Sequence, residues 1–373
     1  MKKNLIVFGT RPEAIKMAPL VNEFKKNAEF FDTRVCVTAQ HREMLDQVLD
    51  FFGIVPDYDL DLMKPNQNLY SLTADIILNL QEVLEDFKPD YVYVHGDTTT
   101  TMAASIAAFY SGAQICHVEA GLRTHNKRAP FPEEINRQIT GRIADYHFAP
   151  TEASRENLLK ENVSPETIVV TGNTVIDALM DSSKRVETIE NEEIAKLKTL
   201  VNPNAKLILV TGHRRENHGD GFIRICEALR EIAITHTDVQ IIYPVHLNPN
   251  VKKPVYELLS GIDNIKLIDP LAYPAFVWLM NQSYMIITDS GGVQEEAPSL
   301  GKPVLVMRDT TERPEAVKAG TVILVGTNRD LIVRETKSLL QDHKRYEIMS
   351  GLHNPYGDGK ASEKIVKFFL NER

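Results

Sequence analysis

Cysteine is scarce in this chain, with three residues among 373. Cys36, Cys116 and Cys226 are far apart in the sequence, and each lies in apolar surroundings. An odd number of cysteines at this spacing forms neither a disulfide framework nor a pairwise metal motif. We therefore expect three buried thiols in a protein of a reducing compartment.

Long apolar runs and an excess of positive charge are also missing. The apolar run at residues 5–8 is too short for the core of a signal peptide, and no stretch approaches the length of a membrane span. A formal net charge of −9 disfavours nucleic-acid backbones and anionic membranes, because both would be repelled over most of the surface. We expect a cytoplasmic protein without nucleic-acid or membrane partners, in which local groups bind any anionic ligand.

Two common nucleotide-binding motifs are absent. Gly9 is followed by Thr10-Arg11-Pro12 and not by the Gly-x-x-Gly that lets a backbone approach a pyrophosphate, and there is no Walker sequence. NAD- or ATP-dependent chemistry therefore lacks its usual indication, and we expect no cofactor.

The sequence does contain a regular alternation of short β-rich runs and longer helical patterns, which is typical of βαβ units and parallel sheets. The length favours two domains. A junction is expected after residues 171–174, where a charged helical stretch runs through Leu200 before a second series of strands begins. The predicted strands are residues 4–8, 33–38, 91–94 and 114–118, then 206–210, 239–243, 265–268, 285–288, 303–306 and 321–325, with helices at 74–87 and 99–110 in the first half.

The two predicted halves repeat the same polar loops. The opening strand of each half runs into a glycine turn with arginine, at residues 9–13 and 212–216, and a later strand ends in a glycine-containing loop, at 95–98 and 289–292. Ligands of open α/β sheets bind at the carboxyl ends of the strands. The sequence therefore predicts an α/β protein of two Rossmann-like domains that face a cleft, with the chemistry on these four loops.

The loop at residues 289–296 has the strongest phosphate-binding pattern. Two glycines between a strand and a helix let main-chain amides close around a phosphate, while Glu296 can accept hydrogen bonds from ribose hydroxyls. The alternative is a tight turn that simply needs glycine.

Other candidate ligand-binding residues lie outside this loop. Arg11 and Lys16 can face an anionic ligand, or can belong to a solvated helix start. His213, followed by two arginines, is a candidate donor to phosphate oxygens, and Phe276 a candidate base-stacking residue.

Three carboxylates are the candidate proton-transfer groups. Asp97 and Glu119 each end a predicted strand, and Glu133 begins a predicted helix after Pro-Phe-Pro. Acids at an anionic-ligand site are unfavourable unless they handle protons or sugar hydroxyls. Each acid alone can be a cap or a surface group. A metal site with His95 and His117 is the weaker interpretation, because no further cluster completes a ligand shell, so we expect no metal.

These segments resemble, over essentially the whole chain, the bacterial non-hydrolysing UDP-N-acetylglucosamine 2-epimerases. The matching segments are residues 9–13, 95–101, 117–123, 132–134, 212–216, 289–298 and 308–315. The resemblance implies a glycosyltransferase-B-type fold, with residues 1–170 and 357–373 in the first domain, 171–356 in the UDP-binding second domain, and a C-terminal helix that returns to the first. It also implies a homodimer that serves polysaccharide biosynthesis.

The resemblance further implies the site residues and the reaction. UDP is expected at Arg11, Lys16, His213, Leu271, Phe276, Ser290, Gly291, Gly292, Glu296 and Arg313, while Asp97, Glu119, Glu133 and His213 are the expected catalytic groups. At Leu271 some relatives carry a polar residue. An allosteric UDP-N-acetylglucosamine site is expected at Gln40, His41, Glu43 and Gln67.

The implied reaction is reversible epimerisation of UDP-N-acetylglucosamine to UDP-N-acetylmannosamine, through loss of UDP to 2-acetamidoglucal and its re-addition. The residues do not show which acid is the base. A glycosyltransferase of the same fold, a hydrolysing epimerase and a nucleotide-sugar sensor remain alternatives.

Overall fold

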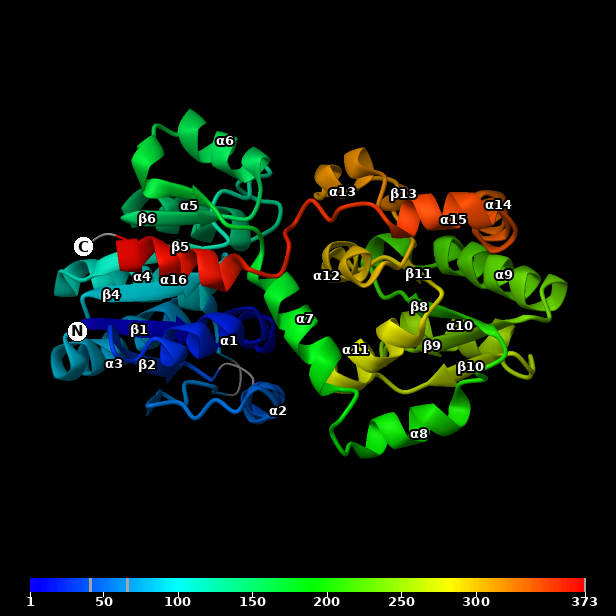
Figure 1. Cartoon of the computed structure of the whole chain (residues 1–373), viewed down its shortest axis with the longest axis horizontal. Helices are drawn as coiled ribbons and strands as arrows, with labels where there is room; N and C mark the ends of the chain where they lie inside the picture. The colour runs from blue at the N-terminus through cyan, green and yellow to red at the C-terminus, as the bar shows by residue number, and fades with distance from the viewer. Residues whose placement is uncertain (40–41, 65–66, 372–373) are drawn as a thin grey trace. The chain divides into compact units, whose positions relative to one another are not determined.

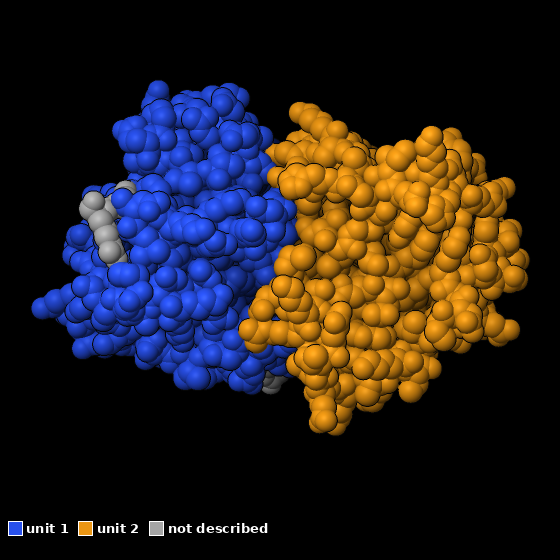
Figure 2. All heavy atoms as spheres, viewed as in Figure 1, with its two compact units in different colours: residues 1–178, 356–373 blue, residues 179–355 orange. Residues whose placement is uncertain are grey.

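The computed structural model describes residues 1–39, 42–64 and 67–371. It divides into two compact units, shown in Figure 2: unit 1 comprises Met1–Ala178 and Tyr356–Arg373, and unit 2 comprises Leu179–Pro355. The chain therefore leaves unit 1 once and returns to it for its last segment.

Unit 1 is built on a parallel sheet with the strand order β3-β2-β1-β4-β5-β6-β7. The strands are β1 (Lys2–Phe8), β2 (Phe31–Val37), β3 (Tyr58–Asp59), β4 (Tyr91–His95), β5 (Gln114–Val118), β6 (Tyr146–Ala149) and β7 (Ile168–Val170). The helices are α1 (Arg11–Lys26), α2 (Arg42–Phe52), α3 (Leu69–Phe87), α4 (Thr99–Ser111), α5 (Glu133–Ile143), α6 (Glu152–Lys160), η1 (Pro165–Thr167), α7 (Thr174–Arg185), which continues into unit 2, and α16 (Ala361–Asn371).

Unit 2 repeats this plan with the order β10-β9-β8-β11-β12-β13, again parallel. Its strands are β8 (Lys206–Thr211), β9 (Val239–Pro244), β10 (Ile265–Ile268), β11 (Met285–Thr288), β12 (Val304–Val306) and β13 (Val322–Leu324). Its helices are α8 (Glu192–Leu200), η2 (Arg215–Asn217), α9 (Asp220–Thr235), α10 (Pro249–Leu259), α11 (Tyr273–Gln282), α12 (Gly291–Glu296), η3 (Ala297–Leu300), α13 (Pro314–Ala319), α14 (Arg329–Gln341) and α15 (His343–Ser350).

Both sheets are covered by helices, so their central strands are buried along their whole length. Every residue of β4 and of β11 is buried. Such strands read as continuous apolar runs because neither face meets water. The polar residues that follow each run are thereby confined to the strand ends, where the loops begin.

The last helix, α16, packs on the sheet of unit 1, as Figure 1 shows. In the sequence, the whole of unit 2 lies between α16 and the rest of unit 1. Phe369 makes edge-to-face contacts with Tyr91 and Tyr93 of β4 and with Phe148 of β6, and Lys2 donates to its carbonyl oxygen at 3.3 Å. Aromatic burial of this kind contributes several kcal/mol to docking an element, on the order of 3–5 for a Phe side chain. The expected return of the C-terminal helix to the first unit is confirmed.

The predicted fold class is confirmed: two parallel sheets with alternating helices form the architecture of the glycosyltransferase-B type. The charged helical stretch predicted through Leu200 is instead two helices, because Asn191 caps a new start at α8 by accepting from the Ile194 amide at 3.0 Å. Cys36, Cys116 and Cys226 are buried free thiols, as expected. Across the described ranges, no helix has the length and apolarity needed to span a membrane.

Candidate active site

The turn between β1 and α1 is organised by the buried Glu13. Thr10 caps α1, and the Glu13 carboxylate accepts from the Gly9 and Thr10 amides at 3.1 and 2.8 Å, a capping box. The same carboxylate accepts from the Thr98 hydroxyl at 2.7 Å, in the loop after β4. Glu13 thus joins the loop that carries Arg11 to the loop that carries Asp97.

Glu119 lies at the end of β5 in a strained backbone conformation. Its φ of +62° is in the left-handed region, which a non-glycine residue adopts at a cost and which often marks functional positions. Its carboxylate forms an ion pair with Lys16 and accepts from the Asn173 amide group at 2.8 Å, and His95 Nε2 lies 3.7 Å away. Burial opposes its ionisation, but Lys16, His95 and Asn173 outweigh burial and hold the pKa of Glu119 below its usual range. Glu119 is therefore a carboxylate that stays charged although its side chain is only 10% exposed.

Asp97 lies in the loop after β4 and is held from α5. Arg137 donates to its carboxylate at 2.6 Å, and the Asn136 side chain donates to its main-chain oxygen at 2.9 Å. Burial raises the pKa of Asp97 to about 6 against the effect of Arg137, and the charges of Glu119 and Glu133 add to the rise. Asp97 thus lies within electrostatic reach of both other predicted acids, and we call Asp97, Glu119 and Glu133 the acid edge.

The histidines near this edge are buried and neutral. Burial lowers the pKa of His95 to about 4 and that of His117 to about 3. His117 Nε2 lies 2.7 Å from the Gly96 carbonyl oxygen, so its ring supports the loop that precedes Asp97. Within the part of the chain that the structure describes, no cluster of three metal-ligating side chains occurs.

In unit 2, the buried Asp289 organises the loop that carries His213. Its Oδ2 accepts from the amides of His213 and Arg214 at 2.9 and 2.8 Å, and its Oδ1 lies 3.6 Å from His213 Nδ1. The His213 ring stacks on His246 with centroids 5.3 Å apart. Burial lowers the pKa of His213; Asp289 opposes this effect, and His246 and Arg214 reinforce it. His213 is thus a half-exposed imidazole with a fixed backbone.

The glycine loop, residues 289–292, is packed directly against Arg313. A Cβ on Gly291 would lie 2.5 Å from Arg313 Nη1, so glycine lets the guanidinium lie over the backbone. Arg313 donates to Glu295 at 2.7 Å and to Glu312 at 2.6 Å, which fixes its side chain. Ser290 caps the short helix α12 with its backbone, and its amide donates to Thr288 Oγ1 at 2.9 Å. The Arg313 guanidinium therefore lies next to the backbone of the glycine loop, an arrangement that suits the binding of a phosphate.

The other residues expected at UDP lie on or beside the same elements. Leu271 and Phe276 are partly buried, just before and within α11, and Glu296 is buried at the end of α12, where its charge affects the Tyr273 hydroxyl. Arg11 is partly buried at the first position of α1. Lys16 is paired with Glu119, so the structure places this cation at the acid edge.

The expected allosteric residues are only partly described. Gln40 and His41, and the side chain of Glu43, lie outside the described residues. Gln67 donates through its amide group to the Leu62 carbonyl oxygen at 2.9 Å.

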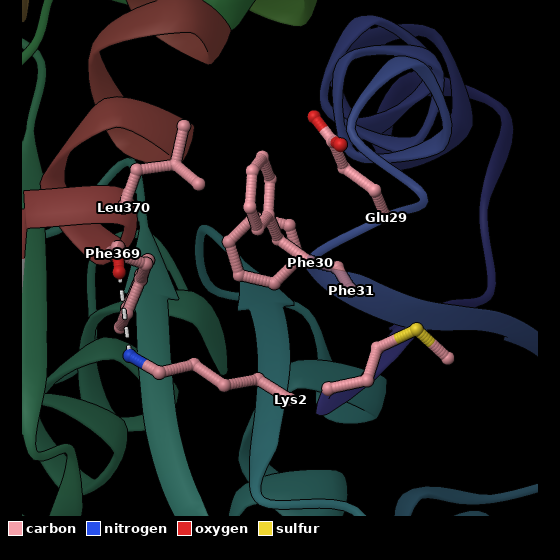
Figure 3. A pocket seen from close by; sticks show the side chains of 7 residues that line it. Lys2, Glu29, Phe30, Phe31, Phe369 and Leu370 are labelled. Atoms are coloured by element: carbon pink, nitrogen blue, oxygen red, sulfur yellow. Dashed lines mark hydrogen bonds between the residues drawn. The ribbon is translucent and has the colours of Figure 1, made fainter. Parts of the chain in front are cut away.

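A separate pocket of about 270 Å³ lies at the other end of the first sheet, at the start of β1 and β2 (Figure 3). It is lined by Met1, Lys2, Glu29, Phe30, Phe31, Phe369 and Leu370. Because the candidate site residues follow the carboxyl ends of the strands, this pocket is not part of the candidate active site.

Three residues that contact the candidate site were not predicted from the sequence. Asn173 was seen only as part of a domain junction, Glu13 only as part of a loop motif, and Arg137 only as part of a helix. The signals that could have found them are a Thr-x-x-Glu capping box for Glu13 and a Gly-Asn pair directly after a strand for Asn173. Nothing comparable indicates Arg137, which reaches Asp97 across 40 residues.

Known proteins match this chain over nearly its whole length. The family model for UDP-N-acetylglucosamine 2-epimerase matches residues 22–370. The UDP-N-acetylglucosamine 2-epimerase of Escherichia coli K12 is 59% identical over 373 residues, covering 100% of this chain and 99% of the relative. The crystal structure of UDP-GlcNAc 2-epimerase from Neisseria meningitidis bound to UDP-GlcNAc is similar with a TM-score of 0.89, at 53% identity over 99% of this chain and 100% of that one.

A more distant structure has the same fold. The Methanocaldococcus jannaschii UDP-GlcNAc 2-epimerase in complex with UDP-GlcNAc and UDP has a TM-score of 0.78 at 34% identity, with both chains covered completely. With a family model that spans most of the chain and relatives that match it end to end, this chain belongs to the UDP-N-acetylglucosamine 2-epimerase family.

Proposed function

We propose that this enzyme interconverts UDP-N-acetylglucosamine and UDP-N-acetylmannosamine by inverting carbon 2 of the sugar. Membership of the family supports the activity, and the names of the matched relatives and their bound ligands support the substrate. Unit 2 holds UDP, with the amides of the glycine loop and Arg313 on the diphosphate. His213, whose ring is half-exposed above Asp289, donates to the same phosphates.

The chemistry proceeds by elimination and re-addition. Carbon 2 has no adjacent carbonyl group, so its proton becomes acidic only as the bond from carbon 1 to the diphosphate breaks and positive charge develops on the ring. UDP leaves with the electron pair of that bond, a carboxylate takes the carbon 2 proton, and the electrons of the C–H bond form the double bond of 2-acetamidoglucal. UDP then adds back while a proton is delivered to the opposite face. Donors on the diphosphate stabilise the departing charge.

The single observation that carries this proposal is a pair of carboxyls at one sheet edge, each held by a cation: Arg137 donates to Asp97 at 2.6 Å, and Lys16 forms an ion pair with Glu119. Asp97 has a pKa raised to about 6, whereas Glu119 is held ionised by its partners. A pair of carboxyls whose environments separate their pKa values is suited to exchanging protons near neutral pH. Binding alone requires no such pair, so an enzyme that moves protons is favoured over a nucleotide-sugar sensor.

The test is incubation with UDP-N-acetylglucosamine in heavy water, without NAD, acceptor or added metal. We expect UDP-N-acetylmannosamine with deuterium at carbon 2, detected by NMR and mass spectrometry. A sugar transferred only when an acceptor is supplied would favour the glycosyltransferase, and free N-acetylmannosamine would favour the hydrolysing enzyme. Unlabelled, unchanged substrate would contradict the proposal.

We also propose that the enzyme is a homodimer. Large apolar side chains are exposed on α3 and α4, which pack against each other: Leu78 is 64% exposed, Phe109 60% and Tyr110 76%. Apolar groups gathered on neighbouring helices are typical of an association surface. Sedimentation should give a dimer that dissociates on Leu78→Glu but not on Ile348→Glu, an exposed residue of α15. A monomeric wild type would contradict this.

A further inference from the structure

Asn173 contacts three separate parts of unit 1. Its main-chain N–H donates to the Tyr356 carbonyl oxygen at 2.7 Å, and its side-chain amide donates to Glu119 Oε2 at 2.8 Å. Its side-chain oxygen accepts from the Val175 amide at 3.0 Å, in the first turn of α7. Asn173 as a whole residue is 3% exposed. One buried residue therefore links the segment that leaves unit 1, the segment that returns to it, and a carboxylate of the acid edge.

The two segments at this point touch through their backbones. We call residues 172–173 and 356–357 the crossing segments: 172–173 directly precede α7, the helix on which the chain passes into unit 2, and 356–357 directly follow the last residue of unit 2. Gly172 has a φ of +90°, and a Cβ there would lie 3.1 Å from the Tyr356 oxygen and 3.2 Å from Gly357 Cα. Only glycine allows this approach without displacing the other segment.

We propose that Asn173 is a positioning residue that couples the position and charge of the Glu119 carboxylate to the contact between the two crossing segments. The inference rests on the proposed function, since it takes Glu119 as a proton-transfer group.

The geometry explains how the coupling arises. Among the described residues, four charged or polar groups act on the Glu119 carboxylate: Lys16 from α1, His95 from β4 and Asn173 by contact, and Asp97 from the loop after β4 through its charge. Of these four, Asn173 is the one that belongs to a crossing segment, and its main-chain N–H donates to Tyr356 of the other crossing segment. Its side chain is held at both ends, by Val175 and by Glu119, so a shift of the crossing moves the donor relative to the carboxylate.

The direction of the effect follows from the chemistry of the bond. A hydrogen bond donated to a carboxylate stabilises its ionised form and lowers its pKa. Lengthening the bond from Asn173 would therefore make Glu119 easier to protonate.

The principal variant is Asn173→Asp. It keeps the shape and the oxygen that accepts from Val175, but it replaces the donor with a second carboxyl against Glu119. We expect kcat to fall by about 10- to 100-fold, the value of a hydrogen bond to a charged group, and the limb of the pH profile governed by Glu119 to move to higher pH. Asn191→Asp is the matched control, because the Asn191 side chain also accepts from a main-chain amide in the first turn of a helix, α8, and lies in unit 2.

Asn173→Ser is the second variant. It also lacks the amide donor but adds no negative charge, so we expect a similar loss of kcat with a smaller shift of the pH limb. Thermal melting of all variants separates loss of fold from loss of positioning. A wild-type pH profile in both Asn173 variants, whatever their rates, would mean a merely structural role and would overturn the proposal.

The coupling itself is tested with Gly172→Ala, which perturbs the crossing without touching Glu119. We expect lower kcat with a shift of the same limb in the same direction. In the double variant with Asn173→Asp, the two losses should not multiply, because both act through one hydrogen bond. Losses that multiply to within a factor of about two would show independent sites and refute the coupling.

The heavy-water assay of the wild type distinguishes the two failures. A wild type without exchange at carbon 2 overturns the proposed function and this inference with it. An active wild type beside variants with unchanged pH profiles leaves the function standing and overturns the inference alone.

Discussion

Each sheet ends in a carboxylate that organises its loops, buried in the case of Asp289 and partly buried in the case of Glu119, but the two carboxylates have different partners. Asp289 of unit 2 accepts mainly from main-chain amides, which fix the loop of His213. Glu119 of unit 1 is faced instead by the side chains of Lys16, His95 and Asn173. We infer that a carboxylate whose shortest hydrogen bonds come from main-chain amides serves the fold, while one held by side chains keeps a charge that chemistry can use. The comparison teaches that the partners of an acid, and not its place at a strand end, decide its role.

The largest effect is expected from Glu119→Gln. If Glu119 is the proton-transfer group we propose, its removal lowers kcat by about 10²- to 10⁴-fold, while UDP, which we assign to unit 2, should bind with unchanged affinity in calorimetry. Glu82→Gln, an exposed position on α3, is the matched control. If Glu119→Gln keeps turnover within a few-fold of wild type, Glu119 does not differ from Asp289 in serving the chemistry.

Asp289→Ala should act on stability. It leaves the amides of His213 and Arg214 without their acceptor, which costs about 2–4 kcal/mol in the free energy of unfolding. Urea denaturation checks this, with Asp263→Ala at an exposed position of unit 2 as the control. A change as small as that of the control would mean that Asp289 is not needed to hold the loop.

Arg313→Lys tests the diphosphate site of unit 2. Lysine keeps a cation near Glu295 but loses the planar fork that can bind two phosphate oxygens at once. We expect UDP to bind about tenfold more weakly, near 1.4 kcal/mol, measured by calorimetry. Arg329→Lys, at an exposed ion pair with Glu231, should leave the affinity unchanged. Equal effects at both positions would remove Arg313 from the UDP site.

Arg137→Met should give the smallest effect, a shift of the pH profile. Asp97 is protonated below its pKa of about 6 and ionised above it. Arg137 favours the ionised form, so its removal raises the pKa, and the limb of kcat/KM that reports Asp97 should move to higher pH whether Asp97 acts as acid or base. Arg155→Met, in a half-exposed ion pair on α6, is the control. A shift to lower pH would contradict the assignment.

Much of this architecture could be predicted from the sequence because its signals are local. Alternating apolar runs and helical patterns predicted the two parallel sheets, and the Pro-Phe-Pro entry predicted the helix that begins at Glu133. The polar residues directly after the strands predicted which loops carry chemistry. The break between α7 and α8 was missed, since both sides have helical periodicity and only the cap at Asn191 separates them.

Residues that reach a site from another element could not be found in this way. Arg137 contacts Asp97 from 40 residues away, and Asn173 contacts Glu119 from 54. Arg137 has no unusual neighbourhood in the sequence, and the Gly-Asn pair at residues 172–173 indicates a turn but not its partner Glu119. Their contacts exist because a parallel sheet gathers the ends of distant strands at one edge.

The sequence by itself determined the elements, the glycine turns at their ends and the family, since these depend on periodicity, residue type and order along the chain. Tertiary structure decided which charges meet. It paired Lys16 with Glu119, placed Arg137 on Asp97, and joined Asn173 to both an acid and a chain crossing. The reason is physical: the charge state of a buried group depends on burial and on partners a few ångströms away, and those partners are brought together only when the chain folds.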